Sequence, residues 1–297
     1  MIRVGILYIL YNTDLDLLNK SIKSLEDTMP VSLDATFFMY NNSQNDIKDD
    51  IVINSKFKYF FEGTNIGLAK AQNKIIIENK DSVDYFLTSD QDTIYSNKYL
   101  EIGIDFMEKN IDCGCVVPVW RNLLSKNQNF ESQIILLDNK LKLINPTDVK
   151  KDHFSIIHAI CSGSLIRVNM FDKIGLFNED FFIDWIDNEW MWRGHKLGLN
   201  LICNKNLQLS HQWGESPFKF MNIEIPKKSN LRVYYTIRNG LAMIFHKKME
   251  SYFKKYLLKQ LVRYLFLVII SFNYKKYMSL FKAILDAKNI DVSSVKR

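Results

Sequence analysis

The sequence has few cysteines, and their spacing argues against two common structural roles. Only four cysteines occur among the 297 residues, at Cys113, Cys115, Cys161 and Cys203. One residue separates Cys113 from Cys115, which does not match a zinc knuckle, and the four positions do not form a disulfide framework. We therefore predict reduced thiols in the core, as expected of a cytoplasmic protein.

Long apolar runs and flexible linkers are also lacking. The stretch Tyr264–Phe272 is apolar except for Ser271, and it is much shorter than the roughly 20 residues that a membrane-spanning helix needs. The first apolar run ends at Asn12 without a small-residue cleavage site, so we expect no signal peptide. Internal repeats and Pro/Gly/Ser-rich linkers are not visible. The length then suits one large domain, or one medium domain with an appendage.

Enough apolar sequence is present for a sizeable core, and the positive charge lies at one end. Hydrophobic residues make up 47% of the chain and aromatic residues 13%, which excludes a disordered chain. The net charge is +6, but residues 241–297 carry 12 basic and 3 acidic side chains, a net charge of +9, so the remainder carries −3. Such asymmetry suggests an anionic surface as a partner.

Apolar runs of strand length alternate with helical patterns in the first half. We predict strands at Val4–Leu10, Ala35–Tyr40, Lys58–Phe61 and Tyr85–Thr88. Apolar residues at helical spacing predict a helix from Leu15, capped by Asp14 or Thr13, and another over Gly67–Glu78. This alternation indicates βαβ units and a mostly parallel sheet, which binds ligands at the carboxyl ends of its strands.

The second half is less regular. Val116–Val119 resembles a strand, and residues 121–152 resemble a surface excursion that contains a hairpin of Ile134–Leu137 and Leu141–Ile144. From Asn230 onward we expect helix.

Polar clusters follow three of the predicted strands, at Tyr11–Asn12, Asn41–Asn42 and Asp90–Asp92. The third cluster places two like charges together. Asp90 and Asp92 flank Gln91 directly after an apolar run. Two carboxylates this close repel unless a positive group lies between them. A divalent cation bound by these hard oxygen ligands would remove the repulsion and could bridge a diphosphate. A solvated loop is the alternative for this motif on its own.

With its surroundings, this motif resembles the family 2 glycosyltransferases, which have the GT-A fold, and within them the bacterial rhamnosyltransferases. The resemblance covers roughly residues 2–245. The residues that carry it are Tyr11–Asn12, Asn41–Asn42–Ser43, Asn65 and Gly67 with Asn73, Ser89–Asp90–Gln91–Asp92, Ser162–Gly163–Ser164, Asp184, Asp187 and Glu189 with Arg193, and His211.

The resemblance implies an α/β protein with a Rossmann-like, mostly parallel central sheet flanked by helices. It also implies an enzyme that transfers a sugar from a nucleotide-diphosphate donor, with inversion, to a saccharide hydroxyl. We expect L-rhamnose from dTDP-rhamnose, and an acceptor that is lipid-linked, in O-antigen or capsule synthesis. A UDP-hexose or UDP-N-acetylhexosamine donor is the alternative. A nucleic-acid-binding protein, suggested by the basic tail, would leave the carboxylates and His211 unexplained, as would a catalytically inactive sugar-binding module.

The family pattern assigns roles to individual residues. Asp92, His211 and Asp90 match the residues that hold the metal ion in the family, with Mg²⁺ or Mn²⁺ as the ion. The alternative role for Asp90 is to hold the donor ribose or sugar. The expected donor-binding residues are Tyr11, Asn12, Asn41, Asn65, Gly67, Asp90, Gln91 and Arg238. Many family members have Asp at the position of Asn41, so the preferred base stays open.

Asp187 matches the general base of the family, and Asp184 and Glu189 are alternatives. If residues 184–193 begin a helix, Asp184 and Asp187 share a face and Glu189 points elsewhere. Capping the helix is the alternative role for Asp184. Trp185 and Trp213 are candidates to stack on the acceptor sugar, although large aromatic residues usually serve packing.

The last segment mixes basic and apolar residues. We expect a catalytic domain over residues 1–245 and a basic, amphipathic helical tail over residues 246–297. Lysines beside aromatic and aliphatic residues suit a helix lying on anionic lipid, which would place the protein on the inner face of the cell membrane. The alternative is a helical hairpin that packs on the domain or on a second subunit.

Overall fold

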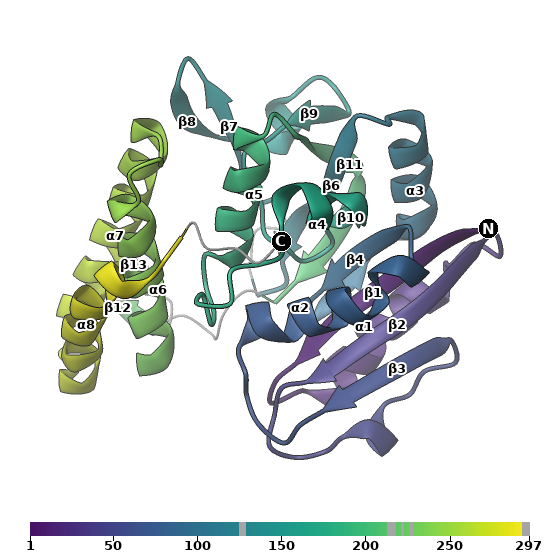
Figure 1. The fold of residues 1–297 in the computed structure, drawn as a ribbon, viewed down its shortest axis with the longest axis horizontal. Helices are drawn as coiled ribbons and strands as arrows, with labels where there is room; N and C mark the ends of the chain where they lie inside the picture. The colour runs from purple at the N-terminus through teal and green to yellow at the C-terminus, as the bar shows by residue number, and fades with distance from the viewer. Residues whose placement is uncertain (125–128, 213–217, 221–222, 226–228, 293–297) are drawn as a thin grey trace.

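A mixed sheet of nine strands organises the computed structural model, which describes residues 1–124, 129–212, 218–220, 223–225 and 229–292 (Figure 1). The strand order is β3-β2-β1-β4-β10-β6-β11-β5, and β9 pairs with β11. The strands span β1 (Ile2–Leu10), β2 (Leu33–Asn41), β3 (Lys56–Phe61), β4 (Tyr85–Ser89), β5 (Thr93–Tyr95), β6 (Cys113–Asn122), β9 (His153–Ser155), β10 (Leu165–Arg167) and β11 (Asn200–His211).

The long pairings are parallel and the short ones antiparallel. Strands β3, β2, β1 and β4 are parallel neighbours, and so are β6 and β11. The three-residue strand β10 runs antiparallel between β4 and β6, and β5 and β9 run antiparallel to β11. The predicted mostly parallel α/β sheet is therefore confirmed. Outside it, β7 (Gln133–Leu137) and β8 (Lys140–Ile144) form the predicted hairpin, and β12 (Phe218–Phe220) pairs with β13 (Ile223–Ile225).

Helices cover both faces of the sheet. On one side, α1 (Leu15–Glu26) and α3 (Tyr99–Lys109) pack on residues such as Ile6 of β1; on the other, α2 (Leu68–Asn79), α4 (Asn169–Ile174) and α5 (Ile186–Lys196) pack on residues such as Leu7. Successive strand residues point to opposite faces, which is why these strands are apolar almost throughout.

Two helix starts decide where site residues lie. The Asp14 side chain accepts a hydrogen bond from the Leu17 amide at 3.1 Å and caps α1, as predicted. Helix α5 begins at Ile186 rather than Asp184, because Asp184 and Trp185 have left-handed backbones with φ of 64° and 67°. Asp184 therefore precedes the helix and does not share a helical face with Asp187.

The C-terminal helices pack on the rest of the molecule. Helices α7 (Ser251–Ile270) and α8 (Tyr274–Asp286) lie against α6 (Asn230–Phe245) at one side of the protein (Figure 1). Phe253 and Leu257 at the start of α7 are buried in the core that also contains α5. The packed hairpin is thus the arrangement of these helices. Among the described residues, no helix combines the length and apolar character needed to cross a membrane.

Candidate active site

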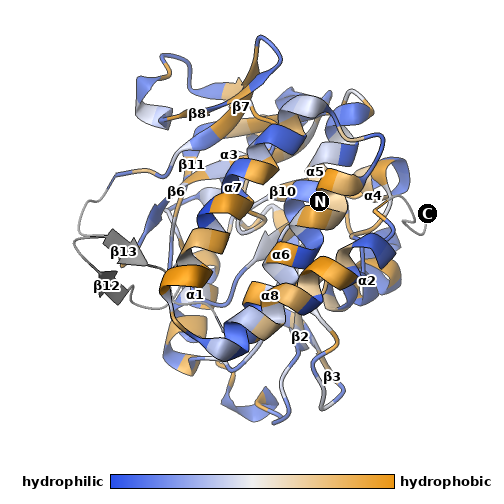
Figure 2. Ribbon diagram, turned by 90° about the vertical axis from the view of Figure 1, so that its left-hand side faces the viewer, coloured by the Kyte–Doolittle hydropathy of each residue, from blue (hydrophilic) through white to orange (hydrophobic). Residues whose placement is uncertain are grey.

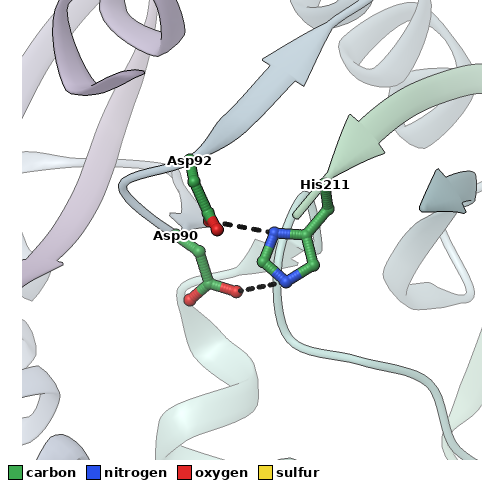
Figure 3. Close-up of side chains that lie close together, drawn as sticks. All are labelled: Asp90, Asp92 and His211. Carbon is green, nitrogen blue, oxygen red and sulfur yellow. Dashed lines mark ion pairs between the residues drawn. The ribbon is translucent and has the colours of Figure 1, made fainter. Parts of the chain in front are cut away.

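Two carboxylates and an imidazole converge at the carboxyl end of β4 (Figure 3). Asp90 and Asp92 lie in the loop between β4 and β5, and His211 ends β11, where it pairs with Thr93. Asp92 Oδ1 is 3.0 Å from His211 Nδ1, and Asp90 Oδ2 is 3.7 Å from Nε2. One ligand atom from each residue lies within 4.8 Å of the others. This set of hard oxygens and one imidazole fits a divalent cation such as Mg²⁺ or Mn²⁺.

Burial of Asp90, and the two carboxylates beside His211, bias this cluster toward holding protons when it is alone. Desolvation by the surrounding protein raises the pKa of Asp90, although 48% of its side chain is exposed. The charge of His211 opposes this rise, and the charge of Asp92 adds to it. Burial lowers the pKa of His211, but Asp92 and Asp90 outweigh this and leave that pKa raised. A cation would have to displace the imidazole proton, so binding should strengthen as pH rises.

A tight turn next to β4 holds this loop in place. The Asp90 amide donates to Ser162 Oγ at 3.2 Å, and Ser162 Oγ is 2.6 Å from Thr93 Oγ1. The adjacent Gly163 donates to the Thr88 carbonyl at 2.7 Å and has φ of 78°. A Cβ at Gly163 would lie 2.3 Å from Leu209 Cδ2, so only glycine fits here.

Gln91, expected to bind the donor, connects the ends of β1 and β4. Its Oε1 accepts hydrogen bonds from the Tyr11 amide at 2.9 Å and from Thr13 Oγ1 at 3.0 Å, and its Nε2 donates to the Tyr11 carbonyl at 3.2 Å. The amide therefore positions the loop between its two carboxylate neighbours. The Tyr11 side chain remains half-exposed beside it, and the neighbouring Asn12 amide donates to Ser43 Oγ at 2.9 Å.

Asn41 is buried and its amide is occupied. Its Nδ2 donates to the Asn45 carbonyl at 2.7 Å and to Tyr59 Oη at 2.9 Å, while Oδ1 accepts from the Ser43 amide at 3.1 Å. No part of this side chain is exposed. Asn41 therefore shapes the loop after β2, and its contact with the donor stays a prediction.

The Asn65 and Gly67 pair forms the turn that starts α2. Asn65 Oδ1 accepts from the Gly67 amide at 2.9 Å, and Gly67 has φ of 89°. A Cβ at Gly67 would lie 2.7 Å from the Phe182 ring, and the Leu68 amide donates to the Phe182 carbonyl at 2.7 Å. The close backbone approach that this glycine permits is therefore to the loop before α5.

Asp187 lies in the first turn of α5, next to the metal-type cluster, that is, the group of Asp90, Asp92 and His211. Its Oδ2 accepts from the Cys161 amide at 2.9 Å, and Cys161 immediately precedes the Ser162 that binds the Asp90 loop. Burial raises the pKa of Asp187 to about 6, backbone N–H groups including that of Cys161 oppose the rise, and the charge of Asp90 adds to it. A carboxylate with such a pKa can accept a proton near neutral pH.

Glu189, the alternative base, lies in the interior. Its side chain is fully buried and forms an ion pair with Arg193, one turn along α5, at 2.6 Å. Arg193 also donates to the carbonyls of Ile174 and Leu176. This pair ties α5 to the end of α4, away from solvent.

Asp184 and Trp185 attach the loop before α5 to α6. Asp184 Oδ1 is 3.0 Å from Arg232 Nη2, its other oxygen contacts the Thr236 hydroxyl, and Trp185 Nε1 donates to the Thr236 carbonyl at 2.9 Å. Trp213, the second expected acceptor residue, lies outside the described residues.

Arg232 is a site residue that the sequence motifs did not reveal. Arg238, expected near the donor, is only 8% exposed, stacks on Tyr235 and donates to the neighbouring Asn239. Arg232, in the first turn of α6, keeps 43% of its side chain exposed, and its charge lowers the pKa of both Asp90 and His211. The signal in the sequence that could have identified Arg232 is its position, as a basic residue at the start of the helix expected from Asn230.

Comparisons with known proteins agree with this architecture. Residues 6–175 match the family model described as Glycosyl transferase family 2. The chain is 25% identical over 236 residues to the curated "dTDP-rhamnosyl transferase RfbF" of Shigella flexneri, a match that covers 79% of this chain and 77% of the relative.

Solved structures of glycosyltransferases share the fold. GalNAc-T7 with UDP, GalNAc and Mn²⁺ superposes with a TM-score of 0.64 at 13% identity, covering 96% of this chain and 54% of that one. TarS of S. aureus gives 0.61 at 12% identity, covering 96% and 48%. This chain thus spans about half the length of these two proteins. The resemblance seen in the sequence is confirmed: the chain belongs to glycosyl transferase family 2 and has the GT-A fold.

Proposed function

We propose that the protein is an inverting, metal-dependent glycosyltransferase that transfers L-rhamnose from dTDP-rhamnose to a saccharide hydroxyl. The observation that carries the proposal is the convergence of Asp90, Asp92 and His211 beside Asp187, on either side of the Cys161–Ser162 turn. The rhamnose donor is supported by the relative named as a dTDP-rhamnosyl transferase. A UDP-hexose or UDP-N-acetylhexosamine donor is the second candidate, supported by similar structures that contain UDP.

Asp92, His211 and Asp90 would hold Mg²⁺ or Mn²⁺, which supplies positive charge for the leaving diphosphate. Arg232 would add a guanidinium on the same side, where its planar N–H groups suit phosphate oxygens. Gln91 keeps Asp90 and Asp92 at the end of β1, where Tyr11 is available for donor contacts.

Asp187 would act as the base. The acceptor oxygen forms a bond to the anomeric carbon, the bond between that carbon and the diphosphate oxygen breaks, and the hydroxyl proton passes to an Asp187 carboxylate oxygen. A single displacement of this kind inverts the anomeric configuration. The hydrogen bond from the Cys161 amide fixes one carboxylate oxygen and so orients the other.

The outer face of α7 and α8 would rest on the cytoplasmic surface of the cell membrane. Along α7, α8 and the turn between them, basic residues alternate in the sequence with apolar residues whose side chains are about half exposed or more. Figure 2 shows hydrophobic and hydrophilic positions interspersed along both helices. The exposed apolar residues of this face are Leu258, Val262, Phe266, Ile269, Phe272, Tyr274, Met278, Phe281, Ile284 and Leu285. Contiguous apolar surface with flanking lysines suits anionic lipid. This placement would bring the enzyme to a lipid-linked acceptor in O-antigen or capsule synthesis.

Metal-dependent donor turnover tests the proposed activity. Wild-type protein should hydrolyse or transfer sugar from dTDP-rhamnose only when Mn²⁺ or Mg²⁺ is present, because the diphosphate needs a counter-charge. Asp92→Ala should lower turnover by about 10²-fold or more, as expected when charge stabilisation of the leaving group is lost. Asp81→Ala, which removes an exposed carboxylate before the amino end of β4, should leave turnover unchanged. Turnover of a UDP-sugar but not of dTDP-rhamnose would show that the donor is a UDP-sugar. Turnover that needs neither metal nor Asp92 would contradict the mechanism.

The pH profile of transfer tests the role of Asp187. The base must be ionised, and its pKa is about 6, so kcat/KM at saturating metal should fall about tenfold per pH unit below that value. Asp187→Asn should lower kcat by about 10²–10⁴-fold. Asp180→Asn makes the same change at an exposed position seven residues earlier and should have no effect. Normal transfer by Asp187→Asn would assign the proton to another group.

Co-sedimentation with vesicles tests the membrane face. Wild-type protein should bind phosphatidylglycerol-containing vesicles more tightly than phosphatidylcholine vesicles. Phe266→Ser with Phe281→Ser should weaken binding by about tenfold or more, because two aromatic side chains no longer leave water. Ile77→Ser, a control on α2 at 55% exposure, close to the 56% of Phe266, should bind as wild type. Equal binding by all three proteins would refute this orientation, and a dimer that dissociates in the double variant would assign the face to a second copy.

A further inference from the structure

A basic groove lies between the β7–β8 hairpin and α7, apart from the metal-type cluster. Its volume is about 410 Å³. Five basic side chains line it, and none of its lining residues is acidic. They are Lys140, Lys142, Lys255, Lys259 and Arg263. Among the described residues no carboxylate forms an ion pair with any of the five. Such a concentration of unneutralised charge in a concave site attracts a ligand with more than one negative charge.

The groove continues into an apolar surface along the same helix. Lys255, Lys259 and Arg263 follow one another at intervals of four residues, so they lie in one row along α7. Leu258, Val262 and Phe266 have the same spacing one residue out of step, so they form a parallel row about 100° around the helix. The ligand that matches both rows has an anionic head and an apolar chain.

Side-chain contacts connect the groove to Asp187. Tyr256, which lines the groove, has its ring centroid 5.5 Å from that of His158. His158 Nδ1 is 2.7 Å from Asn188 Nδ2, and Asn188 directly follows Asp187. Ile134, another lining residue, pairs with His158 in a β-bridge. The groove is therefore on the side of the site that holds the base.

We propose that this groove binds the diphosphate head of an amphiphilic lipid acceptor whose chain lies along Leu258, Val262 and Phe266. The assignment rests on the proposed function, since the saccharide of such a lipid would present its hydroxyl to Asp187. Five cations suit a diphosphate better than a single phosphate, because charge-assisted hydrogen bonds can form from several directions. The hairpin and α7 then select the acceptor, whereas Asp90, Asp92, His211 and Arg232 serve the donor.

Calorimetric binding of farnesyl diphosphate to the full chain tests this site. EDTA is present so that the diphosphate cannot bind through metal at Asp90 and Asp92. Wild-type protein should bind farnesyl diphosphate more tightly than either inorganic pyrophosphate or farnesol, and added salt should weaken binding. Lys259→Glu with Arg263→Glu should weaken it by roughly tenfold for each lost charge-assisted contact.

The matched control is Lys20→Glu with Lys23→Glu, which makes the same charge change on exposed positions of α1. It should bind farnesyl diphosphate as wild type does, and thermal unfolding should verify that both double variants are folded. The proposal is overturned by no binding, by equal loss in the two double variants, or by pyrophosphate binding as tightly as the lipid. Binding of an RNA oligonucleotide with no preference for farnesyl diphosphate would assign the groove to nucleic acid. Donor turnover by wild-type protein is measured separately, so failure of the proposed function and failure of this site give different results.

Discussion

The repulsion between Asp90 and Asp92 is the constraint on which the rest of the site depends. The chain brings two carboxylates together at the end of a buried strand and places His211 3.0 Å from one and 3.7 Å from the other. Such an arrangement is costly unless a proton or a cation lies among the three groups. The neighbouring structure keeps the residues from moving apart: Gln91 ties the loop to β1, and the Ser162–Gly163 turn holds it from the other side.

The turn that contains Cys161 and Ser162 connects the proposed metal site with the proposed base. Ser162 accepts from the Asp90 amide, and Cys161 donates to Asp187, so two consecutive residues set the position of the loop that carries Asp90 and Asp92 and of the proposed base, Asp187. Helix α6 completes the arrangement, because Arg232 in its first turn forms an ion pair with Asp184 and also influences Asp90 and His211. The start of α7 is buried in the same core, so the basic groove and the apolar face stand in a fixed position relative to this centre.

The sequence predicts the parts of the site that depend on local spacing. The strand ends, the D-x-D pair and the helix cap at Asp14 follow from patterns a few residues long, and the structure bears out these elements. His211 lies more than a hundred residues from Asp92, and only the family pattern linked the two. The packed arrangement of α7 and α8 could not be read from amphipathic spacing, since a helix with one apolar face suits a protein surface and a membrane surface equally.

The use of individual polar groups depends on tertiary contacts and is not visible in the sequence. Asn41 and Arg238 have the composition of ligand-binding residues, but their hydrogen bonds go to Tyr59 and Asn239 within the protein. Left-handed backbones at Asp184 and Trp185 move the start of α5 by two residues. Aspartate adopts this conformation more often than most residues, but a tryptophan in it is not expected from the sequence. Arg232 lies beside the cluster only because α6 returns to this edge of the sheet.

Binding of Mn²⁺, followed by electron paramagnetic resonance, tests the central claim most directly. Wild-type protein should bind the ion near neutral pH, and dTDP should tighten binding because the diphosphate completes its coordination. His211→Ala and Asp92→Ala should each weaken Mn²⁺ binding about tenfold or more, as loss of a ligand does. Equal Mn²⁺ affinity in the wild-type and both variant proteins, with or without dTDP, would show that these residues do not form a metal site.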